Sequence, residues 1–264
     1  MKNAILVNSL LAAACLAVSG ASRQVPFGDP VDISADIIVR SLEPNQIHLF
    51  FNDGAAWREH KVIDTDLERS EGLAVADLNG DGRPEIAFTG FLLRAPRHPR
   101  SESYTRIAID ARYHTVNQNT KEAFGDLDGD GRPDLILAPA EKYRNGKPHS
   151  LAWYRNPGGD LEAAWPKHEI APAMNDLHTV KLGDIDGDGA LDVVTGRAWG
   201  EMEVRACYND GAGGFSSQQV IVSGKGLYSG VLADIEADGD LDIIGQDTYA
   251  NESRPYLCEC LRKP

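Results

Sequence analysis

Four short segments rich in Asp and Gly recur along the chain and constrain its fold more than any other feature. They begin at residues 77, 126, 184 and 234 and read DLNGDGRPEI, DLDGDGRPDL, DIDGDGALDV and DIEADGDLDI. We call them loop 1 (77–85), loop 2 (126–134), loop 3 (184–192) and loop 4 (234–242). Their starts are 49, 58 and 50 residues apart. A period near 50 residues indicates a repeat architecture.

The rest of each repeat predicts β-strands. A short apolar strand runs into each loop, a second leaves it, and a third ends at an Asn-Gly turn. A fourth carries an aromatic-x-x-His-x-aliphatic pattern, seen at Trp57 and Trp165 and more weakly at Tyr104 and Phe215. Four short strands per repeat, with no helical period, predict an all-β fold, namely a β-propeller of four-stranded blades.

The strand count gives about four to five blades. Residues 35–63 read as the last three strands of a blade, and three complete blades follow. Loop 4 opens a last blade, whose third strand is expected at 256–258. Either the two partial blades close a small ring, or the chain is the N-terminal part of a larger propeller. We favour the larger propeller, although an open end would leave an unpaired strand edge.

The N-terminus has the pattern of a signal peptide. Lys2 precedes an apolar run from Ala4 to Val18, and the small residues Ser19-Gly20-Ala21 follow. This predicts cleavage after Ala21, so that residues 1–21 are removed and residues 22–264 form the propeller. A lipoprotein site at Cys15 and a buried N-terminal helix are less favoured alternatives. The mature chain is therefore expected to be secreted, extracellular or periplasmic, without a transmembrane segment.

Export would place three cysteines in an oxidising compartment. One bridge from Cys207 to either Cys258 or Cys260 is open, and the sequence does not select between them.

The net charge lies almost entirely in the four loops. The chain has 40 Asp and Glu against 26 Lys and Arg, a formal net charge of −14, and fifteen of the acidic residues occupy loop positions 1, 3, 5 and 9. An acidic chain of this kind argues against nucleic acid and anionic membranes as partners, because both need a basic face. Cations, neutral sugars and proteins remain.

The spacing within each loop suits calcium. Oxygen ligands at positions 1, 3, 5 and 9, with a backbone carbonyl at position 7 and Gly at position 6, make a hard, all-oxygen donor set. Position 12 lacks the Glu of an EF-hand. Asp-Gly turns without metal are the alternative interpretation. The expected ligand positions, for structural calcium, are Asp77, Asn79, Asp81, Arg83 and Glu85; Asp126, Asp128, Asp130, Arg132 and Asp134; Asp184, Asp186, Asp188, Ala190 and Asp192; and Asp234, Glu236, Asp238, Asp240 and Asp242.

A second candidate site lies six residues before each loop. Glu71, Thr120, His178 and Tyr228 occupy this position and would ring the mouth of a propeller channel. Glu, His and Tyr are groups that act as general acids and bases. The alternative is that they make local hydrogen bonds at strand starts. The repeat histidines and tryptophans are expected to pack rather than to act on a ligand.

Loops 2 and 3, each between a short apolar strand and an aliphatic one, resemble FG-GAP/VCBS repeats, and the resemblance covers roughly residues 35–260. It implies β-propellers, often seven-bladed, with calcium in these loops, as in integrin α-subunits. The Trp-x-x-His-x-Ile element is similar to secreted bacterial members attached to carbohydrate-active enzymes. The resemblance thus implies an extracellular role in adhesion or glycan handling.

Two functions are therefore weighed. The favoured one is a secreted calcium-binding propeller that acts as a binding or adhesion module for a glycan or a protein, with no catalytic residue assigned. The alternative is the propeller domain of a polysaccharide lyase or sugar dehydratase, with Glu71, His178 and Tyr228 at a channel-mouth active site.

Overall fold

The structure is a computed structural model that describes residues 36–42, 44–52, 57–66, 71–115, 119–140, 149–247 and 255–258. Within this part the regular secondary structure is almost entirely β-strand, and the remaining residues lie in loops and turns. The strands are β1 (Ile37–Leu42), β2 (Asn45–Asn52), β3 (Trp57–Asp64), β4 (Ala74–Ala76), β5 (Glu85–Phe88), β6 (Phe91–Arg94), β7 (Thr105–Ala108), β8 (Thr120–Gly125), β9 (Asp134–Pro139), β10 (His149–Tyr154), β11 (Lys167–Met174), β12 (Leu177–Gly183), β13 (Asp192–Arg197), β14 (Glu203–Tyr208), β15 (Ser217–Ser223), β16 (Ser229–Ala233), β17 (Asp242–Gln246) and β18 (Pro255–Cys258).

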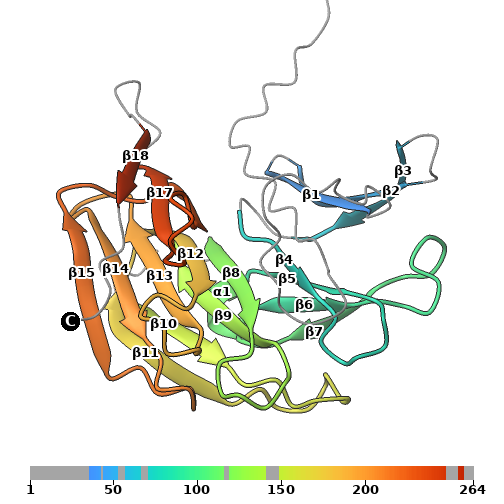
Figure 1. The fold of residues 1–264 in the computed structure, drawn as a ribbon. Helices are drawn as coiled ribbons and strands as arrows, with labels where there is room; N and C mark the ends of the chain where they lie inside the picture. The colour runs from blue at the N-terminus through green and yellow to red at the C-terminus, as the bar shows by residue number, and fades with distance from the viewer. Residues whose placement is uncertain are drawn as a thin grey trace, which may run out of the picture.

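The strands form five antiparallel sheets in chain order. The first sheet is β1-β2-β3, the second β4-β5-β6-β7, the third β8-β9-β10-β11, the fourth β12-β13-β14-β15 and the fifth β16-β17-β18. Every hydrogen-bonded neighbour is also a sequence neighbour, so each sheet is a simple meander. The sheets follow one another along an arc, with β8 and β12 toward its middle and β11 and β15 outside (Figure 1). This all-β arrangement confirms the expected fold class and is compatible with propeller blades.

Most of the expected strands are confirmed. The three strands expected in residues 35–63 are β1 to β3, and the weak copies of the fourth-strand pattern are β7 and β15. The one difference is a short helix, α1 (Ala111–Thr115), in the connection between the second and third sheets. Five residues are too few to show a helical period in the sequence. That the chain belongs to a larger propeller stays a prediction.

Each acidic loop joins the first strand of its sheet to the second. Loops 1 to 4 thus connect β4 to β5, β8 to β9, β12 to β13 and β16 to β17. The glycine at position 6 has a φ of +80° to +95° in all four loops. An L side chain rarely adopts this conformation, so glycine is required there. Position 4 also has a positive φ, and in loop 4 the residue there is Ala237, with a φ of 58°. Loop 4 therefore carries backbone strain that the glycines of the other loops avoid.

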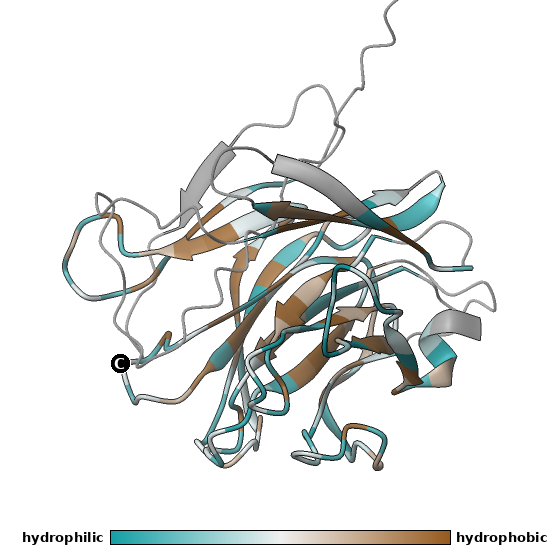
Figure 2. Cartoon of the chain, turned by 90° about the vertical axis from the view of Figure 1, so that its right-hand side faces the viewer, coloured by the Kyte–Doolittle hydropathy of each residue, from teal (hydrophilic) through white to brown (hydrophobic). Residues whose placement is uncertain are grey.

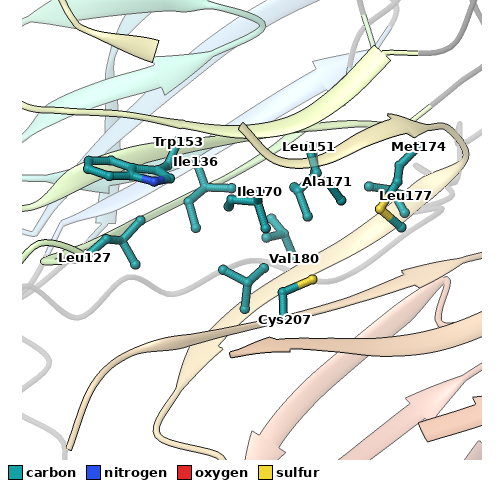
Figure 3. Close-up of a cluster of buried hydrophobic side chains, with 12 residues drawn as sticks. Leu127, Ile136, Leu151, Trp153, Ile170, Ala171, Met174, Leu177, Val180 and Cys207 are labelled. Atoms are coloured by element: carbon teal, nitrogen blue, oxygen red, sulfur yellow. The ribbon is translucent and has the colours of Figure 1, made fainter. Parts of the chain in front are cut away.

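The core lies between successive sheets. Four clusters of buried apolar side chains join the first sheet to the second, the second to the third, the third to the fourth, and the fourth to the fifth. Figure 3 shows the third of these, where Val180 and Cys207 of the fourth sheet lie opposite side chains of the third. Hydrophobic residues accordingly concentrate on the strands and hydrophilic ones in many of the loops (Figure 2).

The central strands of the third and fourth sheets are buried on both faces, whereas the end sheets leave apolar side chains exposed. All six residues of β9 are buried, since Leu135 and Leu137 face the second sheet while Ile136 faces the fourth. In the first sheet, Val39 and Val62 both pair with His48 across the sheet, and both are exposed. In the fifth sheet Val231 is exposed as well. The two end sheets thus each leave apolar side chains in contact with solvent.

The repeat aromatics pack as expected. The Trp153 ring stacks on His168, its cross-strand neighbour, with ring centroids 4.2 Å apart, and its Nε1–H donates to the Gly213 carbonyl. Trp165 is buried and donates to the Leu161 carbonyl at 3.1 Å. These contacts explain the aromatic-x-x-His pattern as packing on the outer strand. The side chains of Trp57 and His60 lie outside the described residues.

Several sequence expectations concern parts that the structure does not describe. The signal peptide and Cys15 lie outside the described residues, as do Cys260 and the side chain of Cys258. Cys207 is a buried, free thiol, so the structure forms no bridge from it. No helix of the described part is long and apolar enough to cross a membrane.

Candidate metal centres and the strand-start cluster

Loops 2 and 3 each bring three carboxylates together. Carboxylate oxygens of Asp126, Asp128 and Asp130 lie within 4.8 Å of one another, as do those of Asp184, Asp186 and Asp188. Three like charges this close repel one another strongly unless a cation lies between them. An all-oxygen donor set with three negative charges fits a hard divalent cation, so these residues fit the expected calcium.

The loop backbone holds the carboxylates in place by the same hydrogen bonds in each repeat. One oxygen of the Asp at position 1 accepts from the glycine N–H at position 6, at 2.8 to 3.0 Å in all four loops. The Asp at position 5 accepts from the N–H of position 7 at 2.9 to 3.0 Å. The sequence spacing therefore fixes the carboxylates before any ion binds.

Loops 1 and 4 share these hydrogen bonds but do not gather three carboxylates in the described structure. In loop 1, Asn79 supplies an amide at position 3. In loop 4, Glu236 is longer by one methylene, and Ala237 follows it in a strained conformation. The four loops are thus unequal as candidate sites, and loops 2 and 3 are the best formed.

The carboxylate at position 9 is more buried than the side chains at positions 1, 3 and 5 and makes hydrogen bonds of its own. Glu85, Asp134, Asp192 and Asp242 are buried, whereas the groups at positions 1, 3 and 5 face solvent more. One oxygen of each accepts the N–H of loop position 2, at 2.9 to 3.1 Å. The other oxygen of Asp134 accepts the N–H of Asn156 at 2.8 Å, and that of Asp192 accepts Asn209 at 2.8 Å. Position 9 thus ties the loop to the end of the third strand, and its role as a metal ligand stays a prediction.

Burial sets the electrostatics of position 9. It raises the pKa of Asp134 to about 6, although the two N–H donors oppose this, and Asp128 and Asp130 raise it further. The pKa of Asp192 is raised for the same reasons. A cation bound among the neighbouring carboxylates would favour the ionised form.

Arginines distinguish loop 2 from loop 3. Arg155 lies 2.6 Å from Asp128 and 3.0 Å from Asp130, and Arg132 pairs with Asp130. The position of Arg132 is taken by Ala190 in loop 3. These arginines partly neutralise the carboxylates of loop 2, and their ion pairs would have to break for a cation to bind there.

Residues 126–195 match the family model described as an FG-GAP-like repeat. This segment is therefore similar to an FG-GAP-like repeat. It begins at the first Asp of loop 2 and ends beyond loop 3, so it spans both three-carboxylate groups. None of the curated proteins matches the chain.

Three of the four residues that lie six positions before a loop are close together in the structure. Glu71 precedes β4, His178 lies on β12, and Tyr228 precedes β16. The His178 and Tyr228 rings stack with centroids 4.8 Å apart, and Glu71 is near enough to affect the titration of His178. Thr120 is buried and donates instead to Glu122. The structure therefore brings together Glu71, His178 and Tyr228, while Thr120 serves a neighbouring carboxylate.

Two residues that the sequence analysis missed complete this strand-start cluster. The ammonium of Lys121 pairs with Glu71 at 2.7 Å. Burial alone would raise the pKa of Glu71, but Lys121 outweighs it and lowers the pKa. Trp199, in the connection after β13, donates its Nε1–H to His178 Nε2 at 3.1 Å. Both residues fall outside the six-before-the-loop position, so the repeat spacing could not single them out.

The hydrogen bond from Trp199 fixes the state of His178. Indole N–H is only a donor, so Nε2 must accept and the imidazole must carry its proton on Nδ1. Burial, helped by Lys121, lowers the pKa of His178 to about 4. His178 is therefore neutral at ordinary pH, and its Nε2 lone pair is occupied.

This environment predicts acid sensitivity. In the unfolded chain His178 takes up a proton near pH 6.5, whereas in the folded chain it does so only near pH 4. The contribution of neutral His178 to the free energy of unfolding is thus fully present above pH 6.5. It is lost as the pH falls toward 4, by up to about 3 kcal/mol. Denaturant unfolding of metal-free protein between pH 7 and 4 measures this. His178→Gln should flatten the dependence, whereas His98→Gln, on an exposed loop, should not. An equal slope in all three proteins would refute the assignment.

Proposed function

We propose that this chain is a calcium-binding β-propeller module that binds an extracellular glycan or protein. The observation that carries the proposal is the gathering of three Asp carboxylates in each of loops 2 and 3. The FG-GAP-like repeat in residues 126–195 supports it, because it contains both groups. Calcium has a structural role here, holding the first two strands of a blade together.

The donor set favours calcium over transition metals. The three side chains in each group offer only oxygens, and zinc or copper sites usually include His or Cys. Asp126, Asp128 and Asp130 would hold the ion in loop 2, and Asp184, Asp186 and Asp188 would hold it in loop 3. Bound calcium supplies positive charge that offsets the repulsion among these carboxylates and thereby stabilises the loop.

The strand-start cluster is the proposed ligand-binding surface. Lys121 and His178 lie on the first strands of the third and fourth sheets, and the connections beside β4, β13 and β16 supply the other members, Glu71, Trp199 and Tyr228. Partly exposed Trp and Tyr rings beside polar groups suit a sugar, which offers both an apolar face and hydroxyls. The proposed signal peptide would bring this surface to extracellular glycans.

The enzyme alternative receives no comparable support. In that alternative Glu71, His178 and Tyr228 would supply the base and the acid, but the Nε2 of His178 already accepts the hydrogen bond from Trp199. We therefore propose binding without turnover.

The test has two parts. Calcium titration should show at least two sites, one lost in Asp184→Asn/Asp186→Asn and another in Asp126→Asn/Asp128→Asn. Affinity electrophoresis in gels containing polysaccharides should then show retention that Trp199→Ala weakens. Unsaturated uronide, followed by its ultraviolet absorbance, should not form. Calcium-independent behaviour of every variant would contradict the metal role, and uronide release would favour the lyase.

A further inference from the structure

Two buried asparagines each hydrogen-bond to two neighbouring acidic loops. Asn156 follows β10 and Asn209 follows β14, and they are 1% and 4% exposed. We propose that these bridging asparagines couple metal binding between adjacent loops, so that loops 1, 2 and 3 respond to calcium as a linked series. The inference rests on the proposed calcium binding and adds to it how the sites communicate.

Asn209 joins loop 2 to loop 3. Its Nδ2 donates to the Leu127 carbonyl of loop 2 at 2.9 Å and to the Leu191 carbonyl of loop 3 at 3.1 Å. Leu127 lies between Asp126 and Asp128 in the sequence. The hydrogen bond therefore holds the peptide group that separates two expected ligands of the preceding loop.

Asn156 repeats this arrangement one sheet earlier. Its Nδ2 donates to the Leu78 carbonyl of loop 1 at 2.9 Å and to the Pro133 carbonyl of loop 2 at 3.0 Å. Leu78 lies between Asp77 and Asn79, as Leu127 lies between its own ligands. Both bridges end on loop 2, where the Asp134 carboxylate accepts the N–H groups of Leu127 and Asn156. A continuous path of hydrogen bonds therefore runs from loop 1 to loop 3.

The amide of Asn209 is held on both sides. Its Oδ1 accepts the N–H of Gly211 at 3.2 Å and of Gly213 at 3.1 Å, while its backbone N–H donates to Asp192. The side chain cannot follow one loop and release the other without breaking buried hydrogen bonds, which is costly. A cation that orders loop 2 therefore also orders Asn209 and, through it, loop 3. The second ion then loses less conformational entropy on binding.

The second sheet provides a contrast within the same chain. Ala95 occupies the position that corresponds to Asn156 and Asn209, and its N–H faces Glu85 at 3.4 Å. Alanine has no side-chain amide that could donate a hydrogen bond to another loop. In the second sheet the position-9 carboxylate therefore accepts a hydrogen bond from the end of the third strand, as in the third and fourth sheets, but no side chain connects two loops. The asparagine bridge is thus a separate feature of the third and fourth sheets.

The experiment is a site-resolved calcium titration of the full chain by hydrogen–deuterium exchange, read on peptides covering loop 3. Loop 2 is disabled by Asp128→Asn/Asp130→Asn, which keeps the side-chain shapes. Disabling loop 2 should raise the calcium midpoint of loop 3 about fivefold or more, the lower end of ordinary coupling between sites. In an Asn209→Ala background, disabling loop 2 should no longer move that midpoint.

Asp210→Ala is the matched control. The Asp210 carboxylate accepts the N–H groups of Ala212 and Gly214 within the same turn, so its removal loosens the turn but keeps the bridge. Coupling should persist in this variant. An unchanged loop 3 midpoint when loop 2 is disabled in the parent chain would overturn the proposal, and this comparison needs no asparagine variant to fold. If no loop gains protection with calcium, the metal-binding proposal itself fails instead.

Discussion

Removing calcium should lower the melting temperature of this chain by about ten degrees. A site at ten times its dissociation constant contributes about 1.4 kcal/mol, so two well-formed sites contribute about 3 kcal/mol. For a domain of this size each kcal/mol shifts the melting temperature by about 2–4 °C. Thermal unfolding in millimolar calcium and then in EGTA measures the difference.

The matched control replaces the carboxylates that would bind the ion. Asp186→Asn/Asp188→Asn should lower the melting temperature in calcium but leave it nearly unchanged in EGTA. Magnesium should substitute poorly, because it demands a smaller octahedral site. Identical melting curves in calcium and in EGTA would show that the loops do not depend on the ion.

The second large effect concerns a carboxylate at position 9. Asp192→Ala should destabilise the metal-free chain by about 2–4 kcal/mol, because two buried N–H groups lose their acceptor and each unsatisfied group costs about 1–3 kcal/mol. Those donors are Ile185 and Asn209, at 2.9 and 2.8 Å. Denaturant unfolding in EGTA isolates this contribution from any loss of metal.

Asp188→Ala is the control within the same loop. Asp188 is exposed and accepts the N–H of Ala190 at 2.9 Å, so its removal in EGTA should cost less than about 1 kcal/mol. In calcium the difference between the costs of Asp192→Ala and Asp188→Ala should become smaller, because Asp188→Ala then also removes a ligand of the ion. Equal costs for both variants in EGTA would mean that position 9 is not the structural carboxylate inferred here.

Much of the fold could be predicted because the repeat carries it. Turn residues and short apolar strands recur in each unit, so even weak copies such as Tyr104-x-x-Ile107 mark a real strand, β7. The helix α1 could not be predicted, since it is one short element in a single connection. The packing between sheets followed from the apolar strands, whereas the arc in which they lie depends on contacts that no single repeat contains.

The candidate sites were predictable only in part. Spacing identified the carboxylates at positions 1, 3 and 5, because the loop backbone fixes them locally. It also grouped Asp134 and Asp192 with them, but it could not show that both of their oxygens accept backbone N–H groups, one of which comes from a distant turn. Lys121 joins the strand-start cluster from β8 and Trp199 from the connection after β13, and such long-range contacts leave no periodic signal.

The alternation of sheets and apolar clusters has a consequence for how the molecule comes apart. Because the apolar clusters of the described residues each join one sheet to the next in sequence, stability should accumulate along the chain as in a one-dimensional array of interacting units. The end sheets, with Val39 and Val231 exposed, have one supporting interface where inner sheets have two. Amide protection should therefore be greatest in the middle of the arc, and opening should begin by fraying from its ends.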